Sequence, residues 1–77
     1  MNEVKEEILK LIAEEFNMEV NDLDEGMSFQ DDLNADSIEL VELIMSIEEE
    51  YDIEVSEDDL SKFETVGDVI NYLEDIE

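Results

Sequence analysis

One serine of this chain, Ser37, lies where its hydroxyl can accept a phosphoryl group. It follows Asp36 at the start of a strongly apolar helical segment, and N–H groups at a helix start favour a bound phosphate. Taken alone, an Asp-Ser pair more often marks an ordinary helix start. The sequence has no cysteine and no histidine, which excludes a disulfide, a Cys/His zinc site and a Ser/His or Cys/His catalytic pair. Any chemistry at Ser37 must therefore be supplied by a partner.

Residues 36–43 read Asp-Ser-Ile-Glu-Leu-Val-Glu-Leu, a serine followed by a helical segment that is both apolar and acidic. With residues 48–51 and 65–68, this pattern resembles the acyl carrier proteins over nearly the whole chain. The resemblance implies a non-catalytic carrier in which a transferase attaches 4'-phosphopantetheine covalently to Ser37, beside Asp36. The terminal thiol would then carry growing acyl chains as thioesters in fatty acid biosynthesis. A chain without cysteine suits this function, because the carrier's thiol would be that of the prosthetic group.

Four positions depart from the commonest pattern of the family. Asn34 replaces a usual glycine, and asparagine tolerates a left-handed backbone. Ile38 replaces leucine, Leu40 replaces threonine or valine, and Ser56 replaces a frequent proline. Ile38 and Leu40 leave the acyl chain and the partner enzymes open. A specialised carrier for an amino acid, a polyketide or another acyl group is therefore an alternative, although peptidyl carriers usually have glycines just before the serine.

Two further alternatives lie outside the carrier class. One is an acidic interaction domain that is never modified. The other is calcium binding by residues 21–26, which resemble a calcium loop. Aligning Gly26 with the turn glycine of such a loop, however, places Leu23 and Phe29 at ligand positions and leaves no glutamate at the last position. We therefore expect no metal site.

The charge of the chain limits its partners. Three lysines oppose twenty-seven acidic residues, a net charge of -24 that repels nucleic acid and anionic membranes. The expected partners are a phosphopantetheinyl transferase and fatty acid synthesis enzymes with basic docking surfaces. No apolar run approaches the ~18 to 20 residues that span a bilayer, and the N-terminus lacks the pattern of a signal peptide. We expect a cytoplasmic monomer with one acyl carrier domain over residues 1–77.

The spacing of the apolar residues predicts an all-α fold. We expect a small four-helix bundle of three principal helices plus one short helix, with no strand. The principal helices should cover about residues 3 to 16, 36 or 37 to about 51, and a final segment opened by Thr65 and Asp68. The short helix should begin near Ser56. Asp36 and Glu39 have the spacing of a capping box.

Residues 17 to 36 form a long loop between the first two principal helices. A loop of this length in a small domain is usually functional. Apolar residues should anchor the loop to the core, namely Met18, Val20, Leu23, Met27, Phe29 and Leu33.

The helix that follows Ser37 has two apolar faces. Its core face should hold Leu40, Leu43, Ile44, Ile47 and Tyr51. A second, narrower face holds Ile38, Val41 and Met45, with Glu42, Glu48 and Glu49 along its border. We interpret these six residues as a docking site for partner enzymes. The alternative is that the long loop folds over Ile38 and Val41 and buries them.

A fatty chain needs an apolar space near the attachment point. The region between the second principal helix and the short helix is the candidate, with Phe29, Leu40, Ile47, Leu60 and Phe63 as lining residues. Each of these residues can instead be an ordinary core residue.

Overall fold

The structure, a computed structural model, describes residues 3–76. Its elements are α1 (Glu3–Phe16), the 3-10 turn η1 (Val20–Asp22), α2 (Ser37–Tyr51), α3 (Glu57–Leu60) and α4 (Val66–Ile76). Strands are absent from this part of the chain, which confirms the predicted all-α bundle of three principal helices and one short helix. None of the helices described is both long and apolar enough to cross a membrane.

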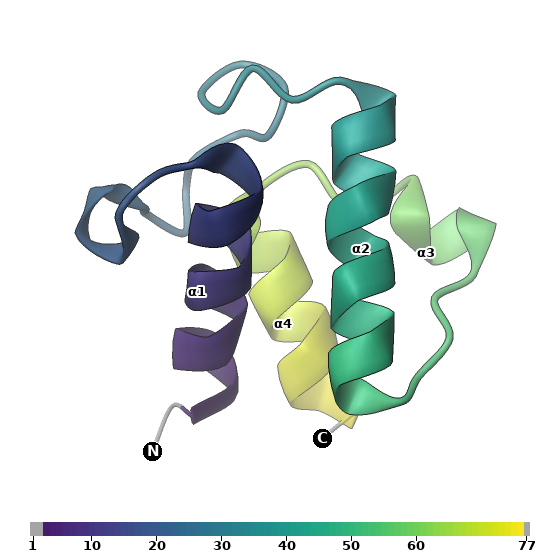
Figure 1. Cartoon of the computed structure of the whole chain (residues 1–77). Coiled ribbons are helices and arrows are strands. Elements are labelled where there is room, and N and C mark those ends of the chain that lie inside the picture. The colour runs from purple at the N-terminus through teal and green to yellow at the C-terminus, as the bar shows by residue number, and fades with distance from the viewer. Residues whose placement is uncertain (1–2, 77) are drawn as a thin grey trace.

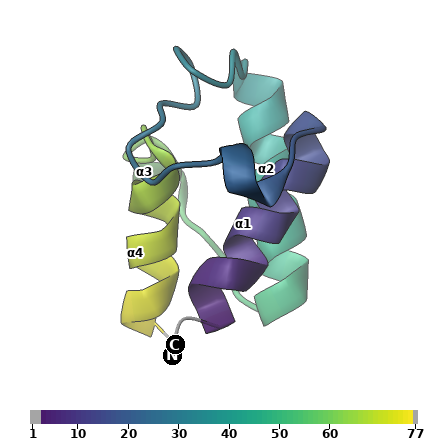
Figure 2. The same ribbon diagram turned by 90° about the vertical axis from the view of Figure 1, so that its left-hand side faces the viewer.

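The three principal helices lie side by side. Helix α1 packs against both α2 and α4, and it runs in the opposite direction to both (Figure 1). The connection that contains α3 leads the chain back to the end of the bundle where α2 begins, so α2 and α4 run the same way. Figure 2 shows the long loop at this same end of the bundle. Ser37 therefore lies at the end where the loop, α2 and the start of α4 meet.

The core forms where the apolar faces of these helices meet. Residues of α2 that were predicted to face inward do so: Leu43, Ile44 and Ile47 are buried, and Leu40 and Tyr51 are half-buried. Burial of large apolar side chains stabilises each helix far more than its intrinsic propensity does. The buried cluster consists of Ile8, Ile12, Phe29, Leu43, Ile44, Ile47, Phe63, Val66, Val69, Ile70 and Leu73.

Side-chain caps fix the starts of α3 and α4 where the sequence predicts them. Ser56 Oγ accepts a hydrogen bond from the Asp59 N–H at 3.1 Å, at the start of α3. At the start of α4, the Asp68 N–H donates to Thr65 Oγ1 at 3.2 Å, and the Thr65 N–H donates to Asp68 Oδ2 at 3.0 Å. These bonds satisfy N–H groups that have no partner within the helix.

The long loop is joined to the start of α4 by backbone hydrogen bonds. The bonds run from Phe29 N to Glu64 O at 3.0 Å, from Val66 N to Met27 O at 3.0 Å, and from Gly67 N to Glu25 O at 2.8 Å. A further tie comes from α1, where Lys5 Nζ lies 2.7 Å from Glu25 Oε2. The loop is thus a fixed part of the fold, which matters because its last residues deliver the chain to Ser37.

Most of the predicted apolar anchors hold the loop. Phe29 is 3% exposed, and the centroid of its ring lies 6.3 Å from that of the Phe16 ring. Leu23, Met27 and Leu33 pack against the core. Val20 was predicted as an anchor and is 37% exposed, so that prediction is wrong for this residue. It belongs to η1, a three-residue turn that has no buried residues.

Candidate functional site

Ser37 is the first residue of α2, and a reciprocal pair of hydrogen bonds fixes its position. The Glu39 N–H donates to Asp36 Oδ1 at 2.9 Å, and the Asp36 N–H donates to Glu39 Oε1 at 3.2 Å. This confirms the predicted capping box. Ser37 itself is exposed. Its hydroxyl therefore lies at a rigid helix start that solvent and partner proteins can reach.

Asn34 turns the chain toward this helix. Its φ is 54°, in the left-handed region. Asparagine adopts this backbone conformation more readily than most residues, as expected from the sequence. Next to it, the Ala35 N–H donates to Phe29 O at 2.7 Å. The bond ties the last residues of the loop to a core aromatic residue. The segment that leads into Ser37 is therefore fixed by the bond at Ala35 before it and by the capping box at Asp36 and Glu39.

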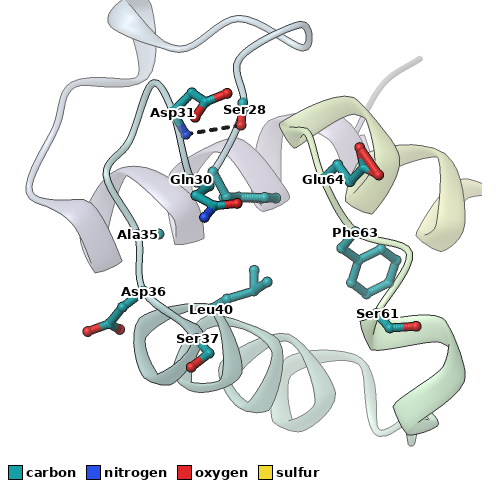
Figure 3. A pocket seen from close by; sticks show the side chains of 11 residues that line it. Ser28, Gln30, Asp31, Ala35, Asp36, Ser37, Leu40, Ser61, Phe63 and Glu64 are labelled. Carbon is teal, nitrogen blue, oxygen red and sulfur yellow. Dashed lines mark hydrogen bonds between the residues drawn. The ribbon is translucent and has the colours of Figure 1, made fainter.

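A hollow of about 740 Å³ lies beside Ser37. Its walls come from the end of the long loop, the first turn of α2 and the segment between α3 and α4. In Figure 3 the side chains of Leu40 and Phe63 point into this space from opposite walls, and Asp36 points away from it. The lining residues are Ser28, Phe29, Gln30, Asp31, Ala35, Asp36, Ser37, Leu40, Ser61, Phe63 and Glu64.

The hollow contains three of the five residues that we expected to line an acyl pocket. Phe29, Leu40 and Phe63 belong to its wall. Ile47 and Leu60 do not: Ile47 is 1% exposed and lies within the core, and Leu60 is a half-buried residue packed against it. The difference arises because the hollow opens at the end of the bundle, whereas Ile47 lies deeper along α2.

Several polar residues of the wall were missed by the sequence analysis. Gln30, Ser61 and Glu64 lie in loops or turns and follow no helical period. Only the fold brings them to α2. The fixed contact between the loop and the start of α4 provides no sequence signal, because it is made by backbone atoms.

Three serines border the hollow, and their hydroxyl groups differ. Ser28 Oγ accepts a hydrogen bond from the Asp31 N–H at 3.1 Å, and Ser61 Oγ donates to the Asp58 carbonyl at 2.8 Å. The Ser37 hydroxyl has no hydrogen-bond partner among residues 3–76. Of the three, Ser37 therefore loses no internal hydrogen bond when its oxygen is modified.

The second apolar face of α2 is exposed. We call Ile38, Val41 and Met45 the α2 strip; these residues are 68%, 38% and 55% exposed. The alternative in which the long loop covers Ile38 and Val41 is wrong, because the loop instead packs toward the start of α4. Glu42 and Glu49, two acidic residues of the expected border, are exposed as well.

Glu48, the third acidic residue of that border, has a structural contact. It is half-buried, and its Oε2 accepts a hydrogen bond from the Val55 N–H at 2.7 Å. The bond fastens the connection that follows α2. Glu48 therefore contributes to the fold, whatever its contact with a partner.

One carboxyl group on α1 is perturbed by the acidic side of α2. Burial raises the pKa of Glu15, and the charge of Glu42 and a hydrogen bond with its side chain raise that pKa further. Glu39 contributes a smaller effect of the same sign. Glu15 on α1 and Glu42 on α2 thus form a pair of carboxyl groups between the two helices, and Glu42 also borders the α2 strip.

Comparison with known proteins identifies the family. Residues 6–73 match the phosphopantetheine attachment site family. The chain is 48% identical over 73 residues to the acyl carrier protein of Buchnera aphidicola from Schizaphis graminum, covering 95% of this chain and 92% of that protein. The chain belongs to the acyl carrier protein family. Like other members, it is a non-catalytic carrier with a covalently attached 4'-phosphopantetheine.

Other relatives and solved structures agree. The acyl carrier protein of Chlamydia felis is 43% identical over 70 residues, covering 91% of this chain and 90% of that protein. A solved structure from Mycobacterium tuberculosis superposes on this chain with a TM-score of 0.89 at 30% identity, covering 96% of this chain and 99% of that one. The acyl carrier protein of Enterococcus faecalis gives a TM-score of 0.77 at 37% identity, with 92% and 90% covered.

The residues at the start of α2 fit the prosthetic group that the family carries. An exposed hydroxyl, a helix start and an adjacent hollow can hold a phosphodiester and the chain attached to it. One alternative outside the carrier class, an acidic interaction domain that is never modified, does not agree with membership of this family.

Proposed function

We propose that Ser37 carries the 4'-phosphopantetheine of this protein and presents acyl chains to the enzymes of fatty acid biosynthesis. The observation that carries the proposal is the hydroxyl group of Ser37, which is exposed and has no hydrogen-bond partner among the described residues, at a capped helix start. The other two serines at the hollow have hydroxyl groups engaged within the fold.

The chain supplies position and charge at Ser37, and a phosphopantetheinyl transferase supplies the catalysis. The enzyme joins the phosphopantetheine of coenzyme A to Ser37 Oγ, which breaks the pyrophosphate bond of coenzyme A and releases adenosine 3',5'-bisphosphate. The enzyme also provides the base that takes the hydroxyl proton, because no side chain among residues 3–76 is hydrogen-bonded to the Ser37 hydroxyl. The partial positive charge at the start of α2 stabilises the phosphodiester formed there. The bound group supplies a terminal thiol, which holds an acyl chain as a thioester.

The hollow beside Ser37 is the proposed place for the first part of the acyl chain. Phe29, Leu40 and Phe63 give it an apolar wall next to the attachment point. Ile47 and Leu60 lie outside this wall, and a longer chain would contact them if α2 and α3 moved apart. Apolar contacts of this kind favour a fatty acyl chain over the amino acid of the specialised-carrier alternative.

The α2 strip is the proposed docking surface for partner enzymes. Its three exposed apolar side chains start next to Ser37, and exposed acidic residues including Glu42 and Glu49 border it. A partner with an apolar groove and a basic rim is complementary to this arrangement. The net charge of -24 would steer such a partner toward the carrier over a longer range.

Intact-mass measurement after incubation with coenzyme A and a broadly acting phosphopantetheinyl transferase tests the attachment site. We expect the wild type to gain one phosphopantetheine and Ser37→Ala to gain none. Ser61→Ala is the matched control, because Ser61 borders the same hollow from the opposite side, and this variant should be modified like the wild type. Modification of Ser37→Ala, or loss of modification in Ser61→Ala alone, would overturn the assignment.

A further inference from the structure

The wall of the hollow opposite α2 depends on an element that is too short to hold itself in place. Helix α3 has four residues and none of them is buried, and isolated helices of this length are unstable in water. Phe63 follows three residues after this helix, is 7% exposed and forms part of both the core and the hollow. Its position must therefore be fixed by contacts with the principal helices.

Tyr72 on α4 makes two such contacts. Its ring meets that of Phe63 edge to face, with ring centroids 5.3 Å apart and planes at 74°. Its hydroxyl donates to Asp59 Oδ2, on α3, at 3.1 Å. Burial and the bond to Asp59 raise the pKa of Tyr72, so its hydroxyl remains a donor at neutral pH.

We propose that Tyr72 is a positioning residue that sets the width of the hollow beside Ser37 and thereby the length of acyl chain that the carrier accommodates. One side chain fixes both Phe63, which forms the wall, and α3, which precedes it. Loss of the hydroxyl would leave the ring contact with Phe63 but release α3, allowing the part of the wall at Ser61, at the end of α3, to move away from Leu40. The inference rests on the proposal that the hollow receives the acyl chain.

The chain contains a matched control for this contact. Tyr51, on α2, also donates its hydroxyl to a carboxylate at 3.1 Å, that of Glu7 on α1. Neither Tyr51 nor Glu7 borders the hollow. Tyr51→Phe and Tyr72→Phe thus each remove a hydroxyl bonded to a carboxylate, and only the second of these bonds holds α3.

Hydrogen exchange measures whether the bond restrains α3. The Leu60 and Ser61 amides donate to the carbonyls of Ser56 and Glu57, so they report on opening of this helix. We expect Tyr72→Phe to speed their exchange about tenfold and Tyr51→Phe to leave it unchanged. Asp59→Ala removes the same bond from its other end and should have the effect of Tyr72→Phe. Equal exchange in both tyrosine variants would overturn the inference.

The second measurement connects the restraint to acyl chains. The wild type and both variants are loaded with saturated acyl thioesters of increasing length, and each form is melted. In the wild type and Tyr51→Phe the stabilisation by the chain should reach its maximum at the same length. In Tyr72→Phe that maximum should shift to chains longer by about two carbons, because each further methylene can then be buried.

The outcomes distinguish a failure of this inference from a failure of the proposal that the hollow receives the acyl chain. A maximum at the same length in all three proteins would overturn the function of Tyr72 while leaving the hollow as the acyl site. If chain length had no effect on the melting temperature of the wild type, the acyl site and the inference would both fall. Neither result would affect the assignment of Ser37, which the intact-mass measurement decides separately.

Discussion

Gly67 and Glu25 approach so closely that Gly67 has no room for a side chain. The Gly67 N–H donates to Glu25 O at 2.8 Å, and a Cβ added to Gly67 would lie 3.0 Å from that oxygen. This contact is the last of the three backbone bonds that join the long loop to the start of α4. The loop forms one wall of the hollow beside Ser37, so the contact at Gly67 helps to shape the functional site.

Replacement of Gly67 by alanine should therefore destabilise the protein. Alanine usually stabilises a helix relative to glycine by about 1 kcal/mol, but here the Cβ must displace the Glu25 backbone. We expect a net loss of about 1 to 2 kcal/mol in the free energy of unfolding, measured by urea denaturation. Gly26→Ala is the control, because the nearest atom to a Cβ there is Asp24 Oδ2 at 3.8 Å. Equal stability of Gly67→Ala and the wild type would contradict this explanation.

The helices and their starts were predictable because their signals are local. Asp36 and Glu39 are three residues apart, and so are Thr65 and Asp68, and each pair makes the bonds that its spacing predicts. The positive φ of Asn34 agrees with its residue type and with the glycine that the family usually has at this position. These features need no knowledge of the rest of the fold.

The parts of the site that the sequence did not predict depend on contacts between residues that are far apart in the chain. The contact of Tyr72 with Asp59 links a helix face to a cap region, and no period of the sequence joins them. The bond from the Val55 N–H to Glu48 similarly gives a structural function to a residue that the sequence places on an acidic surface. Such contacts appear only when the chain is folded.

Asp36 combines a cap with a negative charge next to Ser37, and two substitutions separate these contributions. Asp36→Ala removes the acceptor for the Glu39 N–H and should cost about 1 kcal/mol of stability. Asp36→Asn keeps an acceptor and should melt like the wild type. Both should be modified more slowly by the transferase, because both remove the negative charge next to Ser37. Slower modification of Asp36→Ala alone would mean that Asp36 acts only by positioning Ser37.

The raised pKa of Glu15 predicts a pH dependence of stability. The folded protein binds this proton more tightly than the unfolded chain, so the contribution is present in mild acid, below the ordinary glutamate pKa. It is lost as the pH rises through the higher pKa of the folded state. Glu15→Gln should raise the melting temperature at pH 7 and reduce the fall in stability between mild acid and neutral pH. Thermal melts across this range, at low salt, provide the measurement.

A control for Glu15→Gln must remove a charge without changing the contact with Glu42. Glu14 is an exposed residue of α1, and Glu14→Gln should retain the pH dependence of the wild type. If both variants reduced the pH dependence equally, the total charge of the chain would be the cause and the contact between Glu15 and Glu42 would not.

The α2 strip can be tested against the core on the same helix. Met45 is 55% exposed, whereas Ile47, two residues later, is 1% exposed. Ile47→Ala should cost about 2 to 5 kcal/mol of stability, because it leaves a cavity in the core. Met45→Ala should change stability by less than about 0.5 kcal/mol and should weaken the complexes with the transferase and an acyl-loading enzyme. Urea denaturation and enzyme kinetics of the two variants measure these effects.

The acidic border of the strip needs a variant that leaves the fold intact. Glu48 accepts a hydrogen bond from the Val55 N–H, and Glu42 lies against Glu15, so a change at either position also alters internal contacts. Glu49 is exposed and is the cleaner choice. Glu49→Lys should slow association with partner enzymes and weaken its dependence on salt, because the interaction of exposed charges with a basic surface acts mainly on the association rate. Unchanged kinetics in both Glu49→Lys and Met45→Ala would place the docking surface elsewhere on the carrier.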